Sequence, residues 1–188
     1  MTPSPRDQMI STAMKLFQRE GYAATSWRKL IEASGAPWGS AHHYFPGGKE
    51  QLGVAAVEKA GEGLARFFES CFTADRTAAD GVQKLFEGSA QNLERSGYCE
   101  GCPIATVALE TAATSPALAE ASRQGFLRWQ DAIEAGLLRS GVSADRAPAL
   151  AEALLTLLEG ALILARVTRS PAPLLKAGAS MKVLLQQA

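Results

Sequence analysis

The stretch TSWRKLIEASGAPWGSAHHYFPGGK, from Thr25 to Lys49, predicts two short helices joined by a turn at Gly35. Its first two residues can cap the first helix. Pro37 can open the second helix, because a first turn does not need the N–H that proline lacks. The segment 46–48, Pro-Gly-Gly, then ends it. This is a helix-turn-helix pattern, in which the second helix enters the major groove of DNA.

The two faces of this predicted unit differ in chemistry. Small apolar residues and one aromatic residue can form its inner face: Ala33, Ala36, Ala41 and Phe45. The residues left to face DNA are Trp38, Gly39, Ser40, His42 and His43. Thr25, Ser26 and Lys49 flank the motif with hydroxyl, N–H and ammonium groups, which suit phosphates.

The rest of the chain also shows helical spacing of apolar residues and no strand pattern. Ser4 and Pro5 start a first helix that ends at Gly21. Later helices are expected over residues 51–72, 77–96, 104–114, from 116, 147–168 and from 170. We therefore expect an all-α protein of about nine helices. Residues 1–50 would form a three-helix helix-turn-helix domain, and residues 51–188 a helical bundle for ligand binding and dimerisation.

Composition indicates an ordinary globular protein. Of the 188 residues 47% are hydrophobic, and the formal net charge is zero, so composition alone does not indicate a nucleic-acid partner. The longest apolar run, residues 153–165, falls short of the roughly 20 residues of a membrane span. No signal peptide is evident, and three cysteines suit a reducing compartment. We expect a soluble cytoplasmic protein without a membrane partner.

The late helices indicate assembly. Residues 150–167 are apolar on nearly every side and must be covered on nearly every side. Gly160, in the middle of this helix, lowers helix stability by roughly 1 kcal/mol relative to alanine. A close approach of another helix would explain why a glycine stands there. The cover can come from a second copy or from the same chain. We expect a homodimer through the last two helices.

Three motifs carry a resemblance to a known family. LFxxxGYxxTS spans residues 16–26, LIxxSGxPxGSxxxYF spans 30–45, and PGGKEQL spans 46–52. Together they resemble the N-terminal domain of the TetR family of bacterial transcriptional repressors. GCPIATVALETA, at residues 101–112, is similar to the subgroup of drug-responsive repressors that includes LmrA and YxaF.

The resemblance implies a homodimer that binds a near-palindromic double-stranded DNA operator and is released by a small hydrophobic or drug-like ligand. It implies no enzymatic activity and no cofactor. By position, Trp38, Gly39 and Ser40 would face bases, and the phosphate contacts would come from Thr25, His42, Tyr44 and Lys49. This chain departs from the family at three positions. Pro37 replaces a capping Ser or Thr, Trp38 replaces a small or basic residue, and His42 replaces a phosphate-binding Tyr.

A ligand pocket is expected among the aromatic residues of the central helices, since drug-like ligands favour apolar cavities with a few polar groups. The aromatic candidates are Phe67, Phe68, Phe72, Phe86, Phe126 and Trp129. The polar candidates, which interrupt apolar faces, are Glu110, Gln130 and Glu159. Core packing is the alternative for the aromatic residues, and an exposed edge or a dimer contact for the polar ones.

Two further motifs have alternative interpretations. Adjacent His42 and His43 point about 100° apart on a helix, so we expect DNA contact and no metal site. Cys99 and Cys102 form a C-x-x-C motif, which is either a reduced loop or a thiol switch that alters DNA binding. No catalytic triad or phosphate loop favours an enzyme. The remaining alternative is a helical protein-interaction module without DNA binding.

Overall fold

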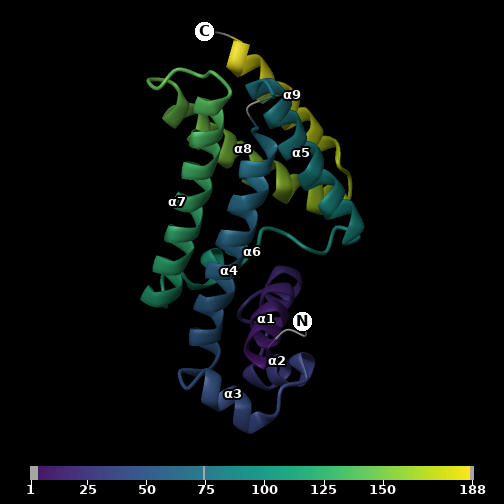
Figure 1. Ribbon diagram of the computed structural model, residues 1–188. Coiled ribbons are helices and arrows are strands. Elements are labelled where there is room, and N and C mark those ends of the chain that lie inside the picture. The colour runs from purple at the N-terminus through teal and green to yellow at the C-terminus, as the bar shows by residue number, and fades with distance from the viewer. Residues whose placement is uncertain (1–3, 74, 187–188) are drawn as a thin grey trace. The chain divides into compact units, whose positions relative to one another are not determined.

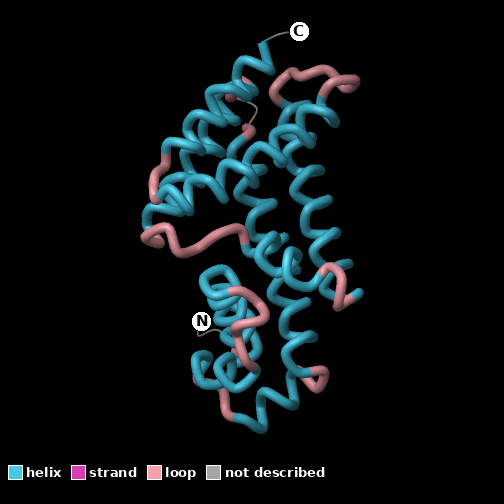
Figure 2. The backbone as a smooth tube through the Cα atoms, turned by 180° about the vertical axis from the view of Figure 1, so that it is seen from behind, coloured by secondary structure: helices cyan, strands magenta, loops and turns pink. Residues whose placement is uncertain are grey.

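The computed structural model of the protein describes residues 4–73 and 75–186. These residues form helices and loops without any strand (Figure 1, Figure 2), which confirms the predicted all-α class and the expected number of about nine helices. The helices of the described part are α1 Pro5–Glu20, α2 Trp27–Ser34, α3 Trp38–Tyr44, α4 Gly48–Cys71, α5 Ala78–Arg95, α6 Pro103–Thr111, α7 Pro116–Arg139, α8 Ala147–Thr168 and α9 Ala172–Gln186.

The chain packs as two compact units. Unit 1 comprises residues 1–61 and 102–126, and unit 2 comprises residues 62–101 and 127–188. By packing, α6 and the start of α7 therefore group with the N-terminal helices, although they lie far away in the sequence. The functional division expected at residue 50 stays a prediction.

Unit 1 is built on well-defined helix ends. Ser4 caps α1 by accepting a hydrogen bond from the Asp7 N–H, and Ser26 caps α2 in the same way from the Lys29 N–H. Gly35 ends α2 in the left-handed conformation, with φ of 67°, which glycine adopts without steric cost. The helices α1, α2 and α3 pack around buried residues that include Met9, Ile10, Phe17, Leu30, Ile31, Ala41 and Phe45.

The predicted inner face of the helix-turn-helix is right at three of its four positions. Ala36, Ala41 and Phe45 are buried, whereas Ala33 is exposed. At 100° per residue, Leu30 and Ile31 centre the buried face of α2, and Ala33 lies well to one side of it. The prediction for Ala33 was wrong because a small apolar residue does not by itself indicate which side of a short helix faces inward.

Unit 2 packs aromatic rings against glycines. Phe72 lies against Gly81 and Gly136, where an added Cβ would come within 2.3 and 2.7 Å of its atoms. Phe86 packs on Gly178 of α9 in a similar way, with 2.9 Å for the added Cβ. The helices α5, α8 and α9 contact one another in this unit. These glycines allow large rings to approach helix backbones, which makes the core dense.

Helix α8 has the bounds that the sequence predicted, residues 147–168. It has 22 residues, and among the described helices it alone is long and apolar enough to cross a membrane by length and composition. The apolar run at residues 153–165 is itself shorter than a span, but the whole helix passes this test because it extends beyond the run at both ends. Only 28% of its most apolar 18-residue window is buried. Much of its apolar surface is thus available to a partner.

Candidate nucleic-acid interface

The helix-turn-helix places α3 on a buried support. Ala41 is fully buried, and Phe45 follows the helix with 1% of its surface exposed. The guanidinium of Arg6 lies 5.6 Å from the centre of the Phe45 ring, within the range of a cation–π contact. Pro37 precedes α3 and provides no side-chain cap. Packing from beneath therefore holds this seven-residue helix in place.

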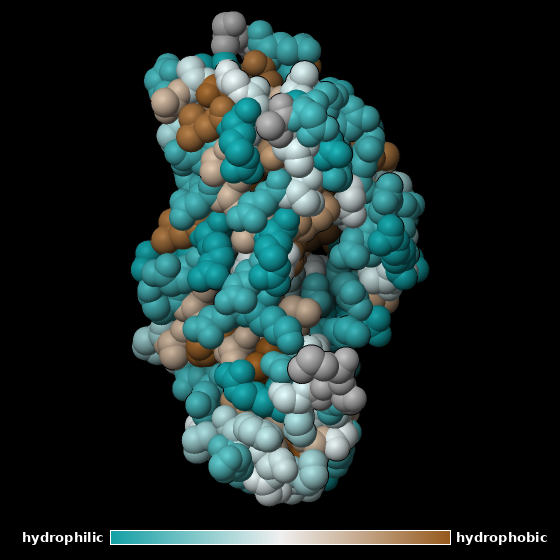
Figure 3. Space-filling model, viewed as in Figure 1, coloured by the Kyte–Doolittle hydropathy of each residue, from teal (hydrophilic) through white to brown (hydrophobic). Residues whose placement is uncertain are grey.

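The opposite face of α3 is open to solvent. Trp38, Gly39, His42 and His43 are exposed, whereas Ser40 and Tyr44 are half-buried. Trp38 keeps 48% of its surface accessible, which is a large fraction for a tryptophan. The surface over α2 and α3 is mostly hydrophilic or intermediate in hydropathy (Figure 3). This face offers ring edges, hydroxyls and imidazoles to a partner.

The predicted residues of α3 contact one another through their rings. The centre of the His42 ring is 6.4 Å from that of Trp38 and 5.9 Å from that of Trp27 on α2. His43 and Tyr44 form a second pair at 5.3 Å. Trp38 and His42 are four residues apart on one helix, so sequence alone could have paired them. Trp27 was missed because only the turn at Gly35 brings α2 alongside α3.

The turn between α1 and α2 uses Thr25 internally. Thr25 is fully buried, its hydroxyl donates to the Gly21 carbonyl at 2.7 Å, and its N–H donates to the Tyr22 carbonyl at 3.2 Å. Both donors are occupied, so the structure gives Thr25 a role in shaping the turn and not the predicted role of a phosphate contact. Ser26 is exposed and accepts the Lys29 N–H, which leaves its hydroxyl hydrogen for a phosphate.

Lys49 lies against the same turn. Its ammonium is 4.0 Å from the centre of the Tyr22 ring. Burial lowers the pKa of Lys49, and the nearby carboxylate of Glu110 opposes that shift. Burial also raises the pKa of Tyr22, with the Glu50 carboxylate acting in the same direction. The cation predicted to contact phosphate is therefore partly desolvated at the edge of the interface, which strengthens its interaction with an anion.

Glu110 on α6 binds this turn, and Ser115, just before α7, binds the start of α4. The Ala23 N–H donates to Glu110 Oε2 at 2.5 Å, and the other carboxylate oxygen of Glu110 lies where a side chain at Gly21 would begin. The Ser115 hydroxyl, just before α7, donates to the Glu50 carboxylate. Glu110, predicted as a ligand residue, thus lies in unit 1 on the α1–α2 turn.

The other predicted ligand residues are mostly core. Phe68 and Trp129 are fully buried and meet edge to face, with ring centres 5.6 Å apart. Phe72 and Phe86 are buried against the glycines of unit 2, and Phe67 packs on Gly88. The half-buried residues of the set are Phe67, Phe126, Gln130 and Glu159. This packing gives the rings a structural role, and their contact with a ligand stays a prediction.

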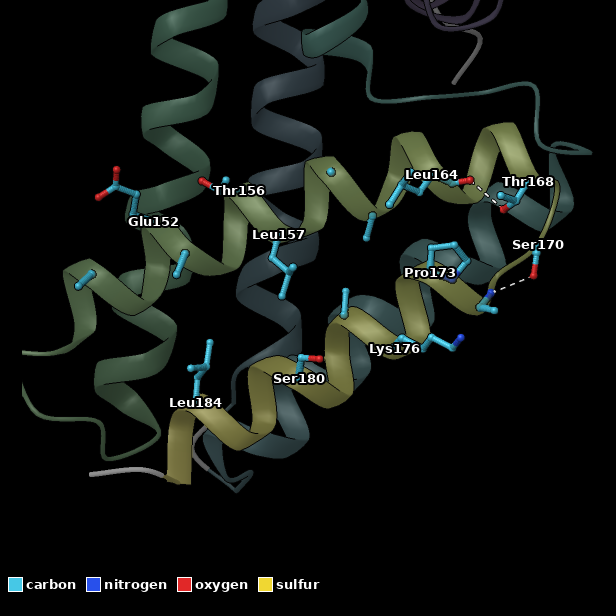
Figure 4. Close-up of a pocket in the computed structure, with 16 residues that line it drawn as sticks. Glu152, Thr156, Leu157, Leu164, Thr168, Ser170, Pro173, Lys176, Ser180 and Leu184 are labelled. Carbon is cyan, nitrogen blue, oxygen red and sulfur yellow. Dashed lines mark hydrogen bonds between the residues drawn. The ribbon is translucent and has the colours of Figure 1, made fainter.

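An apolar groove of about 1160 Å³ runs between α8 and α9 (Figure 4). Leu157 from α8 and Leu184 from α9 point into the space between the two helices. None of the predicted ligand residues lines it. Gly160 lies on this groove, and apart from its chain neighbours and its own helix backbone no atom of the described residues lies within 4 Å of a Cβ added there. The chain itself therefore does not require a glycine at this position.

The cysteines are reduced thiols with different surroundings. Cys102 is buried and caps α6, its sulfur accepting the Ala105 N–H at 3.3 Å. Cys99 is exposed. Cys71 is buried, and burial raises the pKa of its thiol. Cys102 thus has a structural role in the reduced protein, since it satisfies a backbone donor at the start of a helix.

Comparison with known proteins matches both parts of the chain. Residues 9–56 match the domain described as bacterial regulatory proteins, tetR family. Residues 78–180 match the C-terminal domain of LmrA/YxaF-like transcriptional regulators. The chain belongs to the TetR family. Its members are DNA-binding transcriptional regulators, which are not enzymes, and the resemblance stated from the motifs is confirmed for both domains.

Relatives within the TetR family match nearly the whole chain. The HTH-type transcriptional regulator LmrA of Bacillus subtilis is 31% identical over 97% of both chains. An HTH-type regulator of Mycobacterium tuberculosis, Rv0196, is 36% identical over 90% of this chain and 88% of its own. The fold also matches the solved structure of regulatory protein TetR from Rhodobacter sphaeroides, with a TM-score of 0.84 and 23% identity over 94% and 96% of the two chains.

Proposed function

We propose that this TetR-family regulator is a repressor that binds a near-palindromic operator as a homodimer and is released by a small hydrophobic ligand. The observation that carries the proposal is the solvent-facing surface of α3, where Trp38, Ser40 and His43 stand on a buried support. Since the protein acts on DNA, we place it in the cytoplasm and assign it no catalytic activity.

The DNA contacts divide by chemistry. Trp38, Gly39 and Ser40 meet base edges in the major groove, because they lie on the open face of the second helix of the motif. The proposed contacts to the sugar–phosphate backbone come from imidazole, phenol, hydroxyl and ammonium groups. These groups belong to His43, Tyr44, Ser26 and Lys49. Thr25 supports this surface indirectly by closing the turn before α2.

The groove between α8 and α9 supports the homodimer. It is open and mostly apolar, and the neighbouring Ile163 and Val167 expose 54% and 77% of their surfaces. A second copy of the same two helices covers this surface by symmetry, since the same patch is present on both partners. Gly160 then permits a close approach between the subunits, which explains the glycine that the chain itself does not require.

Ligand release follows from differential affinity. Two recognition helices must lie roughly 34 to 36 Å apart to enter successive major grooves. A ligand that prefers a conformation with another spacing lowers operator affinity by the ratio of its affinities for the two conformations. Helix α4 has residues in both units, so it is the element through which we expect unit 2 to act on unit 1.

Selection of bound sequences from random duplex DNA tests the proposal. The purified protein should enrich a near-palindrome, and its affinity for that site should fall steeply as salt rises, because phosphate contacts release counterions. Recovery of no enriched sequence, or affinity independent of salt, would leave a helical protein-interaction module as the better interpretation.

A further inference from the structure

The ring of His42 lies between two tryptophans. Its centre is 5.9 Å from the Trp27 ring, which it meets edge to face at 63°, and 6.4 Å from the Trp38 ring, to which it is tilted by 31°. Both separations fall within the 4.5–7 Å range of favourable aromatic pairs. The three rings form a continuous row from α2 to α3 within unit 1, which we call the Trp27–His42–Trp38 row.

The two ends of this row differ in freedom. Trp27 is half-buried and is the first residue of α2, directly after the capping Ser26. Trp38 is the first residue of α3 and is 48% exposed. An exposed side chain with two rotatable bonds has several accessible rotamers, and a partner that must order it pays an entropic cost. His42 is the side chain that connects the exposed ring of Trp38 to the half-buried ring of Trp27.

Helix α3 needs such a connection. Its N-terminus has no side-chain cap, since Pro37 occupies that position, and the helix has only seven residues. Helices of this length have little stability of their own. Trp27 of α2 contacts His42 in the last turn of α3, and His42 in turn contacts Trp38 at the start of the helix. These ring contacts therefore contribute to holding both the helix and the Trp38 rotamer.

We infer that His42 is a positioning residue for base recognition, which fixes the rotamer of Trp38 through Trp27. In this role His42 acts through its ring and not through a hydrogen bond to phosphate. The held indole presents an apolar ring surface, which suits the C5-methyl group of thymine, and one N–H donor for a base acceptor. The inference rests on the proposed function, in which Trp38 meets base edges.

A phosphate role for His42 predicts different behaviour from a positioning role. A phosphate contact supplies affinity for all sequences. If a protonated imidazole makes it, its loss lowers the slope of log affinity against log salt concentration, the salt slope, by about 1. A positioning residue supplies selectivity, and its loss leaves the salt slope unchanged. The phenylalanine substitution separates the two, because it keeps a planar ring but can neither donate a hydrogen bond nor carry a charge.

The test compares His42→Phe with His42→Ala in the full-length protein. Sequence selection gives the preference of each variant, and binding to the wild-type site at several salt concentrations gives the slope. We expect His42→Phe to keep the wild-type preference, with affinity within about threefold. His42→Ala should broaden the preference at the base pairs that Trp38→Ala also broadens, and lower affinity about tenfold with the same slope.

A double variant keeps the test independent of folding. In a Trp38→Ala background, adding His42→Ala should change the preference no further, since the ring that it positions is already gone. Thermal unfolding confirms that each variant is folded. Equal losses in His42→Phe and His42→Ala, with a salt slope reduced by about 1, would overturn the inference in favour of a phosphate contact. An unaltered preference in His42→Ala would also overturn it, whereas a wild-type protein that selects no sequence would contradict the proposed function itself.

Discussion

The surface of α2 and α3 and the surface of α8 and α9 are both exposed helix pairs, yet they present opposite chemistry. The first shows aromatic rings, imidazoles and hydroxyls above a small buried support. The second shows aliphatic side chains around an open groove. An exposed tryptophan can bind a polar partner because its indole has an N–H hydrogen-bond donor and a ring edge with partial positive charge. Exposed Leu, Ile and Val gain only from being covered. This difference is the reason why we propose that the first pair recognises DNA and the second assembles the dimer.

The largest effect should come from the assembly surface. Gly160→Trp adds a bulky side chain at the α8–α9 groove, where a Cβ meets open space in the single chain but the indole would collide with a second subunit packed on the groove. We expect a monomer by analytical ultracentrifugation. Operator affinity should fall on the order of a thousandfold, because two linked half-site contacts become one.

Gly63→Trp is the matched control for this variant. Gly63 is also an exposed helical glycine with no atom of the chain within 4 Å of an added Cβ, but it lies on α4. This variant should remain dimeric. If Gly160→Trp also remains dimeric, the groove is not the subunit interface.

The next largest effect is expected on protein stability, from substitution of the glycines in the turns before and after α2. Gly21 has φ of 89° and ψ of 164°, a region that is essentially restricted to glycine, and the Glu110 carboxylate fills its side-chain space. Gly21→Ala should lower the free energy of unfolding by about 2 kcal/mol. Gly35→Ala, at φ of 67° with free space around it, should cost only about 1 kcal/mol. Urea denaturation of both variants measures the difference, and equal losses would mean that Glu110 does not constrain the turn.

A smaller effect is expected at Lys49. Lys49→Ala should weaken binding to all DNA sequences alike, by about tenfold at low salt, and should reduce the salt slope by about 1. Oligomeric state should not change, because the residue is far in sequence from α8 and α9 and lies on the α1–α2 turn. Lys15→Ala, an exposed lysine of α1, serves as the control. An unchanged salt slope in Lys49→Ala would show that the Lys49 ammonium contacts Tyr22 but not a DNA phosphate.

Glu110→Gln should have a milder effect on the same turn. The amide oxygen can still accept the Ala23 N–H, but the charge that strengthens this hydrogen bond is lost. We expect operator affinity to fall about threefold, equally for all sequences, and Glu110→Ala to cost about 1 to 2 kcal/mol of stability. Glu58→Gln, on an exposed face of α4, is the control. A change in base preference would show that Glu110 acts on α3 and not on the turn.

The smallest effect is expected at the C-x-x-C motif. Replacing Cys99 and Cys102 with serine keeps a hydroxyl to cap α6, so binding under reducing conditions should stay within about twofold of wild type. Binding measured with and without oxidant decides the thiol-switch hypothesis. Oxidant sensitivity that disappears in the serine variant would support a switch, and sensitivity that persists would exclude these two cysteines.

Local signals made most of the fold predictable from the sequence. Caps such as Ser4 and Ser26, the Gly35 turn and apolar spacing set the helices within a few residues. Contacts between distant segments were not predictable. Glu110 interrupts an apolar helix, which suggested a pocket, but its carboxylate binds the Ala23 N–H, 87 residues earlier in the chain. The sequence did not predict a role for Trp27 for the same reason, since the ring that it contacts, His42, belongs to another helix.

The bond between Glu110 and Ala23 bears on how modular this regulator is. The segment 9–56 matches the DNA-binding domain of its family. Its α1–α2 turn, however, is hydrogen-bonded to Glu110, and its part of α4 is hydrogen-bonded to Ser115, two residues from beyond residue 100. A chimera that joined only this segment to the C-terminal region of another regulator would lose both hydrogen bonds. We therefore expect a chimera to keep the structure of this segment only if it also carries α6 and the residues up to Ser115.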